Sequence, residues 1–201
     1  MKNKRSLLWI ILAVVVAVVV VLLLLLLKPQ DPIALLEEKL TQVTTVKQAT
    51  HTIKVLAGTT QLSLQEDTYQ VDGDSVSLSS TVTQLNPNYV VDGQLMVTTT
   101  QTSTLTLEQF LQKIPRTITL TMDDLVAESY SAVENGTTIT HSMTILPAHV
   151  SAFLDISQEQ ANTITNLQVT IVEQNQLVTT FTLTYTSTSG NNVTVSYCFT
   201  Y

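Results

Sequence analysis

Three patterns of hydrophobic and polar residues follow one another along the chain. Residues are apolar without interruption from Leu7 to Leu27, apolar at every third or fourth position from Ile33 to Val46, and alternately apolar and polar from His51 onward. These patterns are typical of a membrane-spanning helix, an amphipathic helix and β-strands, respectively. The sequence therefore predicts a helix within a membrane, followed by a mostly β domain.

The apolar run is long enough for a helix of about 1.5 Å per residue to cross about 30 Å of hydrocarbon. No small-x-small cleavage site and no cysteine follow it, and this favours a retained signal-anchor over a cleaved signal peptide. Basic residues are concentrated before the run and only Lys28 follows it, so the N-terminus is expected in the cytoplasm. We therefore predict a single-pass anchor in the cell membrane over 1–28 and an extracytoplasmic, cell-surface domain over 29–201.

The predicted domain opens with a helix, because Asp31 suits the N-cap and Pro32 the first helical position. Turn residues then predict hairpins among the alternating segments. The turns are expected at Asp72-Gly73, Asp92-Gly93 and Asn135-Gly136. Between the hairpins we expect short inserted helices over 105–115 and 147–157 and a further strand over 116–122.

Three strands in regular alternation are predicted at the end of the chain. Apolar residues occupy one face of each strand, and threonine, serine and glutamine occupy most of the other face. This pattern is typical of an antiparallel meander that is covered on one side and solvated on the other. Together with the predicted helices, it indicates an α+β fold class.

Composition narrows the range of partners. All sixteen acidic residues lie in 29–201, and such an acidic surface repels nucleic acid. Cys198 is the single cysteine, so no disulfide can form within the chain. Sequons at Asn135 and Asn192 leave glycosylation open.

Candidate chemistry is sparse. The three histidines, His51, His141 and His149, share no spacing typical of a zinc site, and the sequence has no Gly-rich phosphate loop or nucleophile motif. Asp123 and Asp124 are neighbours that would point to opposite faces of a strand. We therefore expect a protein that is not an enzyme, with no catalytic residue, metal or cofactor.

Three segments together resemble a known architecture: the helix at 31–46, the short helix at 147–156 and the strands of 164–201. Their order resembles the LolA/LppX-like half-barrel of bacterial extracytoplasmic lipoproteins and carriers. The resemblance implies a curved, half-barrel-like antiparallel sheet packed on the N-terminal amphipathic helix, with acyl chains held in an apolar concavity. Many members carry a lipidated cysteine where this chain has a leucine-rich run, which favours a tethered binder over a shuttling carrier.

Two functions follow from these expectations. The first is a membrane-anchored binding module for a lipid or another apolar ligand. The second is a surface-exposed structural or protein-interaction domain without a small-molecule ligand, in which the apolar faces are simply core; its protein partner is not readable from the sequence. For the first function, the expected ligand-binding residues are Val169, Ile171, Phe181, Leu183, Tyr185, Val195, Tyr197 and Phe199.

Overall fold

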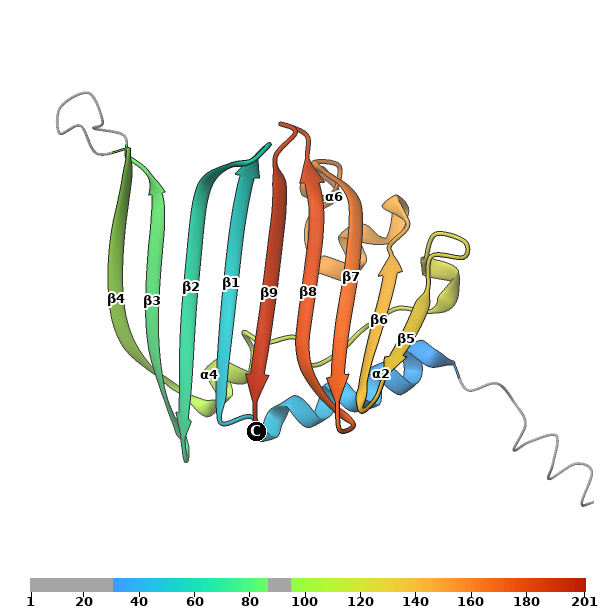
Figure 1. Cartoon of the computed structure of the whole chain (residues 1–201), viewed down its shortest axis with the longest axis horizontal. Helices are drawn as coiled ribbons and strands as arrows, with labels where there is room; N and C mark the ends of the chain where they lie inside the picture. The colour runs from blue at the N-terminus through green and yellow to red at the C-terminus, as the bar shows by residue number, and fades with distance from the viewer. Residues whose placement is uncertain (1–30, 87–94) are drawn as a thin grey trace, which may run out of the picture. The chain divides into compact units, whose positions relative to one another are not determined.

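The computed structural model describes residues 31–86 and 95–201, and over these residues nine strands form one antiparallel sheet (Figure 1). The spatial order of the strands is β4-β3-β2-β1-β9-β8-β7-β6-β5. The strands are β1 (Gln48–Ala57), β2 (Thr60–Asp72), β3 (Ser75–Leu85), β4 (Met96–Thr106), β5 (Ser131–Asn135), β6 (Thr138–Thr144), β7 (Ile164–Gln174), β8 (Leu177–Ser187) and β9 (Asn192–Thr200). The helices are α2 (Pro32–Thr41), α4 (Leu107–Leu111), α5 (Val150–Leu154) and α6 (Gln158–Ala161), with 3-10 turns at Gln42–Thr45, Met122–Asp124 and Pro147–His149.

The path of the chain brings the first and last strands together at the centre of the sheet. From β1 the chain moves outward to the edge strand β4, crosses to the opposite edge at β5, and returns strand by strand to β9. There β9 pairs with β1 from Gln48 opposite Thr200 to Leu56 opposite Asn192. Residues distant in sequence, such as His51 and Tyr197, therefore lie opposite each other.

One face of the sheet is covered by α2 and by the crossing segment between β4 and β5. The apolar stripe of α2, formed by Ile33, Leu36 and Leu40, is at most 1% exposed and belongs to the same buried cluster as Val169 and Ile171 of β7. Helical spacing places these α2 residues on one side, so the short helix is held by packing rather than by its intrinsic propensity.

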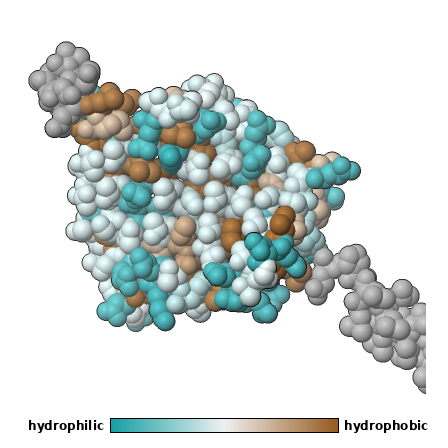
Figure 2. Space-filling view, viewed as in Figure 1, coloured by the Kyte–Doolittle hydropathy of each residue, from teal (hydrophilic) through white to brown (hydrophobic). Residues whose placement is uncertain are grey.

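The opposite face of the sheet is rich in hydroxyl groups. Thr83 and Thr98 are 2.9 Å apart between their hydroxyl oxygens, and Thr182 and Ser196 are 3.0 Å apart. Figure 2 shows a largely pale surface of intermediate hydropathy, as expected for threonine and serine. β-branched threonine suits extended backbone, so this face favours the sheet while remaining wettable.

The predicted fold class is corrected by the structure. We expected an α+β fold with an N-terminal transmembrane helix, a half-barrel-like sheet on an amphipathic helix, and inserted helices. The described residues instead form mostly one nine-stranded antiparallel sheet with few and short helices, the longest of which is α2 with 10 residues. The abundance of β-branched residues and the alternating pattern extend over most of the domain, which explains the dominance of strands.

No helix among the described residues is both long and apolar enough to cross a membrane. The predicted membrane-spanning helix falls on 7–27, which lies outside the described residues. The part of the chain that the structure describes therefore shows no transmembrane helix or signal-anchor.

The strand predicted over 116–122 is also wrong, because 116–121 form no regular element and Met122 begins a 3-10 turn. Ile118 and Leu120 are nevertheless buried, at 1% and 8% exposure. The alternation here reflects an extended chain that crosses the sheet and buries every second side chain. The hairpin expected at Asp92-Gly93 lies outside the described residues.

Candidate functional site

An apolar pocket of about 460 Å³ lies between the α5–α6 region and the ends of β7, β8 and β9. Most of its lining is apolar, and Gln160, Thr163 and Ser187 add polar groups. The apolar residues that line it are Leu154, Ile156, Ile164, Leu183, Tyr185, Val193 and Val195. A concave and mostly apolar lining with a few polar groups is typical of a small-molecule site.

Local sequence positions the wall that α5 and α6 contribute. Asp155 takes a left-handed conformation with φ of 51° and ends α5, so the chain turns before α6 begins. Ser157 then caps α6, because its hydroxyl accepts a hydrogen bond from the backbone N–H of Gln160. The Gln160 side chain in turn accepts from the backbone N–H of Ser157 at 3.1 Å, completing a capping box. These local contacts define the turn between the two helices, which includes Ile156.

The eight predicted ligand-binding residues separate into a core group of four, a pocket group of three, and Tyr197. Val169, Ile171, Phe181 and Phe199 are at most 5% exposed and belong to the core cluster. Leu183, Tyr185 and Val195 are half-buried and line the pocket. Tyr197 is half-buried beside His51, with ring centroids 4.4 Å apart in a stacked arrangement. The structure therefore brings three of the eight together at an open apolar surface.

The side chain of Tyr185 is partly buried. Burial raises the pKa of its hydroxyl above the ordinary value of 10.0, because the phenolate form would lose its hydration. Tyr185 belongs to the pocket lining, and its hydroxyl is neutral at physiological pH. Such a group can donate a hydrogen bond to the polar end of a bound molecule.

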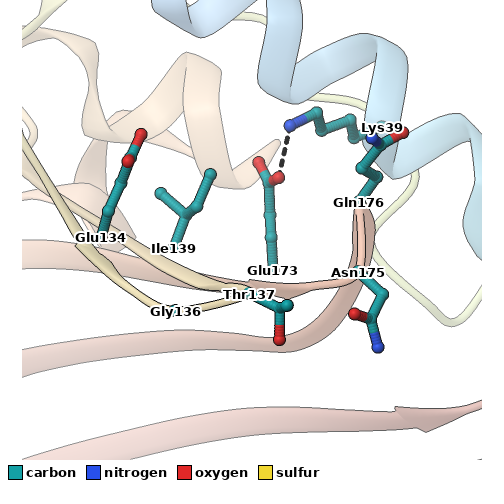
Figure 3. A pocket seen from close by; sticks show the side chains of 8 residues that line it. All are labelled: Lys39, Glu134, Gly136, Thr137, Ile139, Glu173, Asn175 and Gln176. Carbon is teal, nitrogen blue, oxygen red and sulfur yellow. Dashed lines mark hydrogen bonds and ion pairs between the residues drawn. The ribbon is translucent and has the colours of Figure 1, made fainter.

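A separate polar cluster lies beneath α2 (Figure 3). Lys39 of α2 forms an ion pair with Glu173 of β7, whose side chain is 2% exposed. The other carboxylate oxygen of Glu173 lies 3.0 Å from Nε2 of His141, although neither atom makes a well-aligned hydrogen bond. His141 Nδ1 is 3.0 Å from the Tyr130 hydroxyl, so the four side chains form a continuous series.

This cluster borders a second pocket of about 410 Å³, which Figure 3 shows between α2 and the β5–β6 and β7–β8 turns. Glu134, Asn175 and Gln176 contribute to its lining. Burial lowers the pKa of His141 below its ordinary value of 6.5, against the opposing attraction of Glu173. Lys39 is paired with the buried Glu173, so the arrangement is that of a structural ion pair.

Another buried carboxylate, Asp67, lies on the same face of the sheet at 6% exposure. Its carboxylate is 3.1 Å from His51 Nδ1 and accepts a hydrogen bond of 2.9 Å from Gln65. Burial by itself raises the pKa of Asp67, but hydrogen bonds from Ser80, His51 and Gln65 outweigh it and hold the pKa below the ordinary value of 3.8. Asp67 is therefore ionised and fixed in place at physiological pH.

The sequence analysis did not predict the cluster around Glu173 or the cluster around Asp67, although the hydrophobic pattern contains a signal for each. Glu173 continues the alternation of Leu167, Val169 and Ile171, so it falls on the buried face. Asp67 likewise stands two residues before the buried Tyr69. A charged residue that continues a buried face needs a buried partner. The identity of each partner depends on pairing between distant strands, which no local pattern reveals.

Among the described residues, no group of three or more histidine, cysteine, aspartate or glutamate side chains is arranged to hold a metal ion. Each histidine instead contacts one carboxylate, and the third pair joins His149 Nδ1 to Asp124 at 2.8 Å.

No family model matches the chain, and no curated protein is significantly similar to it. Functional inference therefore depends on the geometry described above.

Proposed function

We propose that the domain binds an apolar ligand, with lipid acyl chains as the favoured class, in the pocket between α5–α6 and β7–β9. The observation that carries this proposal is the volume and lining of that pocket: about 460 Å³, bordered mostly by apolar side chains. Small-molecule sites usually occupy about 300–1,000 Å³ and combine such a lining with a few polar groups.

The apolar surface continues beyond the pocket. Val195 and Val193 of β9 lie opposite Ile53 and Val55 of β1, respectively. Val193 is buried at 8% exposure, and the other three side chains are only partly buried. Val82 of β3 is also half-buried on the same face, one strand beyond Gln65. A long chain could therefore extend from the pocket across β9 and β1, where α2 does not complete the covering layer.

The polar residues at the pocket suit a ligand with one polar end. Gln160 and Ser187 belong to the lining, as does Tyr185, whose hydroxyl is neutral. Such groups would fix the orientation of the ligand, while the apolar residues would supply most of the free energy by burial. The resemblance to LolA/LppX-like proteins, and the cell-surface location expected from the sequence, remain predictions that agree with this class of ligand.

Titration of the purified chain with a dansyl-labelled fatty acid tests the proposal. We expect saturable binding with a blue shift of the dansyl emission, as the probe leaves water. Val195→Gln should weaken binding about tenfold or more, because it places an amide in the apolar lining. The matched control is Val133→Gln on β5, where the valine is 63% exposed and outside the pocket lining.

Failure of the wild-type chain to bind the probe, or equal binding by both valine variants, would overturn the proposal. The first result would favour the alternative that the apolar face serves only packing or protein contacts. Native mass spectrometry of the purified chain gives an independent readout, because a co-purified lipid appears as an added mass that organic extraction removes.

A further inference from the structure

The edge strand β4 is exposed to solvent along most of its length. It runs over 11 residues, and all residues from Thr98 to Thr104 are exposed, which means that both faces of the strand are open to solvent. Its sequence, MVTTTQTSTLT, contains no charged residue and no proline. Edge strands present unpaired backbone groups, and natural proteins usually protect them by shortness, charge, proline or a covering element.

The other edge of the sheet has such protection. Strand β5 is only 5 residues long and carries Glu134. The two edges also differ in charge. The chain as a whole has a net charge of −7, but β3 and β4 together contain no charged side chain. Over the residues that the structure describes, the β4 edge is therefore one where two acidic molecules could approach without charges of β3 or β4 meeting at the contact.

The sequence of β4 is nearly the same in both directions from its central residue, Gln101. The mirrored pairs are Thr100 with Thr102, Thr99 with Ser103, Thr98 with Thr104, and Val97 with Leu105. In an antiparallel pair with a two-fold axis at Gln101, each residue would face its mirrored counterpart on the second copy. This symmetry is what an isologous contact between identical strands requires.

We infer that β4 is a homodimer interface, at which a second copy of this chain adds its own β4 in antiparallel register about Gln101. The two sheets then form one continuous sheet, and the unpaired N–H and C=O groups of each β4 find partners. Residues with the same parity share a face, so Val97 packs against Leu105 of the second copy on the covered face. Threonine meets threonine on the outer face, as Thr81 and Thr100 already do within one copy at 3.2 Å.

The geometry also limits the assembly to two copies. A two-fold contact uses the same edge on both molecules and leaves only the β5 edges free. Because β5 is short and carries Glu134, further strand addition there is disfavoured. The expected product is a closed dimer rather than a fibre.

Cysteine cross-linking of the full chain tests the register. In a Cys198→Ser background, which removes the exposed native thiol, Gln101→Cys places two thiols opposite each other at the two-fold axis. Directly opposed residues are about 4.5–5.5 Å apart between Cα atoms, within the range of a disulfide. Mild oxidation should therefore convert most of the protein to a covalent dimer.

Val97→Cys is the matched control, because it lies on the same strand and the same face. In the proposed register the two Val97 positions are eight residues apart along the strands, or about 27 Å. It should remain monomeric under the same oxidation. A monomeric Gln101→Cys variant, or equal cross-linking at both positions as in parallel pairing, would overturn the inference.

A second experiment measures mass by light scattering without any cross-link. Thr102→Lys introduces a charge at the centre of each β4, and the two-fold axis brings two such charges together. We expect the mass to fall from dimer to monomer while the circular dichroism spectrum is unchanged. Val133→Lys, on the β5 edge, should leave the dimer intact, and a dimeric Thr102→Lys variant would contradict the proposed interface.

Discussion

At the scale of single residues, the fold depends on a few charges that lie where apolar side chains are expected. Glu173 occupies the covered face of β7, and its side chain is 2% exposed while that of Lys39 is 28% exposed. A buried carboxylate without a partner costs several kcal/mol, so Lys39 stabilises the fold by pairing with Glu173. The ion pair joins α2 to strand β7 of the sheet.

Lys39→Met should lower the free energy of unfolding by about 3 kcal/mol, because it leaves the Glu173 carboxylate buried with only His141 beside it. Urea denaturation followed by circular dichroism measures the loss. Lys54→Met is the matched control, since Lys54 is exposed on β1 and its replacement should change stability by less than about 0.5 kcal/mol. Equal effects of the two substitutions would refute the role of the pair.

The double variant Lys39→Met with Glu173→Leu sharpens this test. It removes both charges and leaves apolar groups of similar size, so it should recover most of the stability lost by Lys39→Met. No recovery would mean that Lys39 acts through packing of its aliphatic chain rather than through the ion pair.

The histidine of the same cluster should make stability depend on pH. The pKa of His141 is lowered from 6.5 by burial, so the folded state binds this proton less strongly than the unfolded chain does. The resulting stability is fully present above about pH 6.5 and is lost as the pH falls below it. Glu173, Lys39 and the Tyr130 hydroxyl are the groups that face His141 and tune this effect.

His141→Gln should therefore flatten the decline of the melting temperature between about pH 7 and pH 5.5. His149→Gln serves as control, because the His149 side chain is 42% exposed. A wild-type and a His141→Gln curve of the same slope would show that other groups dominate the acid response.

At the scale of elements, local patterns predicted most of the final sheet correctly. The three strands expected at the end of the chain are β7, β8 and β9, and the turn at Asn135-Gly136 joins β5 to β6. These succeed because alternation and turn residues are local signals. The strand predicted over 116–122 was wrong, because an extended chain that crosses a sheet shows the same alternation of apolar and polar residues as a strand within it.

The turn between β7 and β8 offers a test of local backbone strain. Asn175 and Gln176 both have positive φ, 52° and 69°, between paired residues Gln174 and Leu177. A left-handed conformation costs a residue with a side chain about 1–2 kcal/mol, and Asn-Gly is the favoured pair for such a two-residue turn. Here the turn holds no glycine, although both of its residues have positive φ.

Gln176→Gly should therefore stabilise the protein by about 0.5–1 kcal/mol and raise the melting temperature by about 2 °C. Gln176→Ala provides the control, because alanine loses the same side-chain amide but keeps the cost of positive φ. A gain of equal size in both variants would show that removal of the glutamine side chain, not the backbone conformation, is responsible.

At the scale of the whole molecule, the pairing of β1 with β9 determines much that the sequence could not reveal. It sets His51 against Tyr197 and joins the apolar positions of β9 to those of β1, which together form the extended surface proposed for the ligand. Alternation predicted which residues share a face, but not which strands are neighbours. It therefore could not separate the core residues Val169 and Phe181 from the pocket residues Leu183 and Val195.

The same pairing predicts how the molecule opens. Terminal strands usually fray first, but here the first and last strands lie at the centre of the sheet, and each is hydrogen-bonded on both sides. The Tyr201 hydroxyl further ties the C-terminus to the sheet by donating to the carbonyl of Val178 at 2.7 Å. Opening β9 would expose the centre of the core, so it should require global unfolding.

Hydrogen exchange measured by mass spectrometry checks this expectation. Amides of β1 and β9 should exchange together, at the slowest rate in the domain, and their apparent free energy of opening should equal that from urea denaturation. Amides of β5, a short edge strand, should exchange much faster. If β9 instead exchanged as early as β5, the C-terminal strand would open independently, and the β1–β9 pairing would not hold the centre of the sheet together.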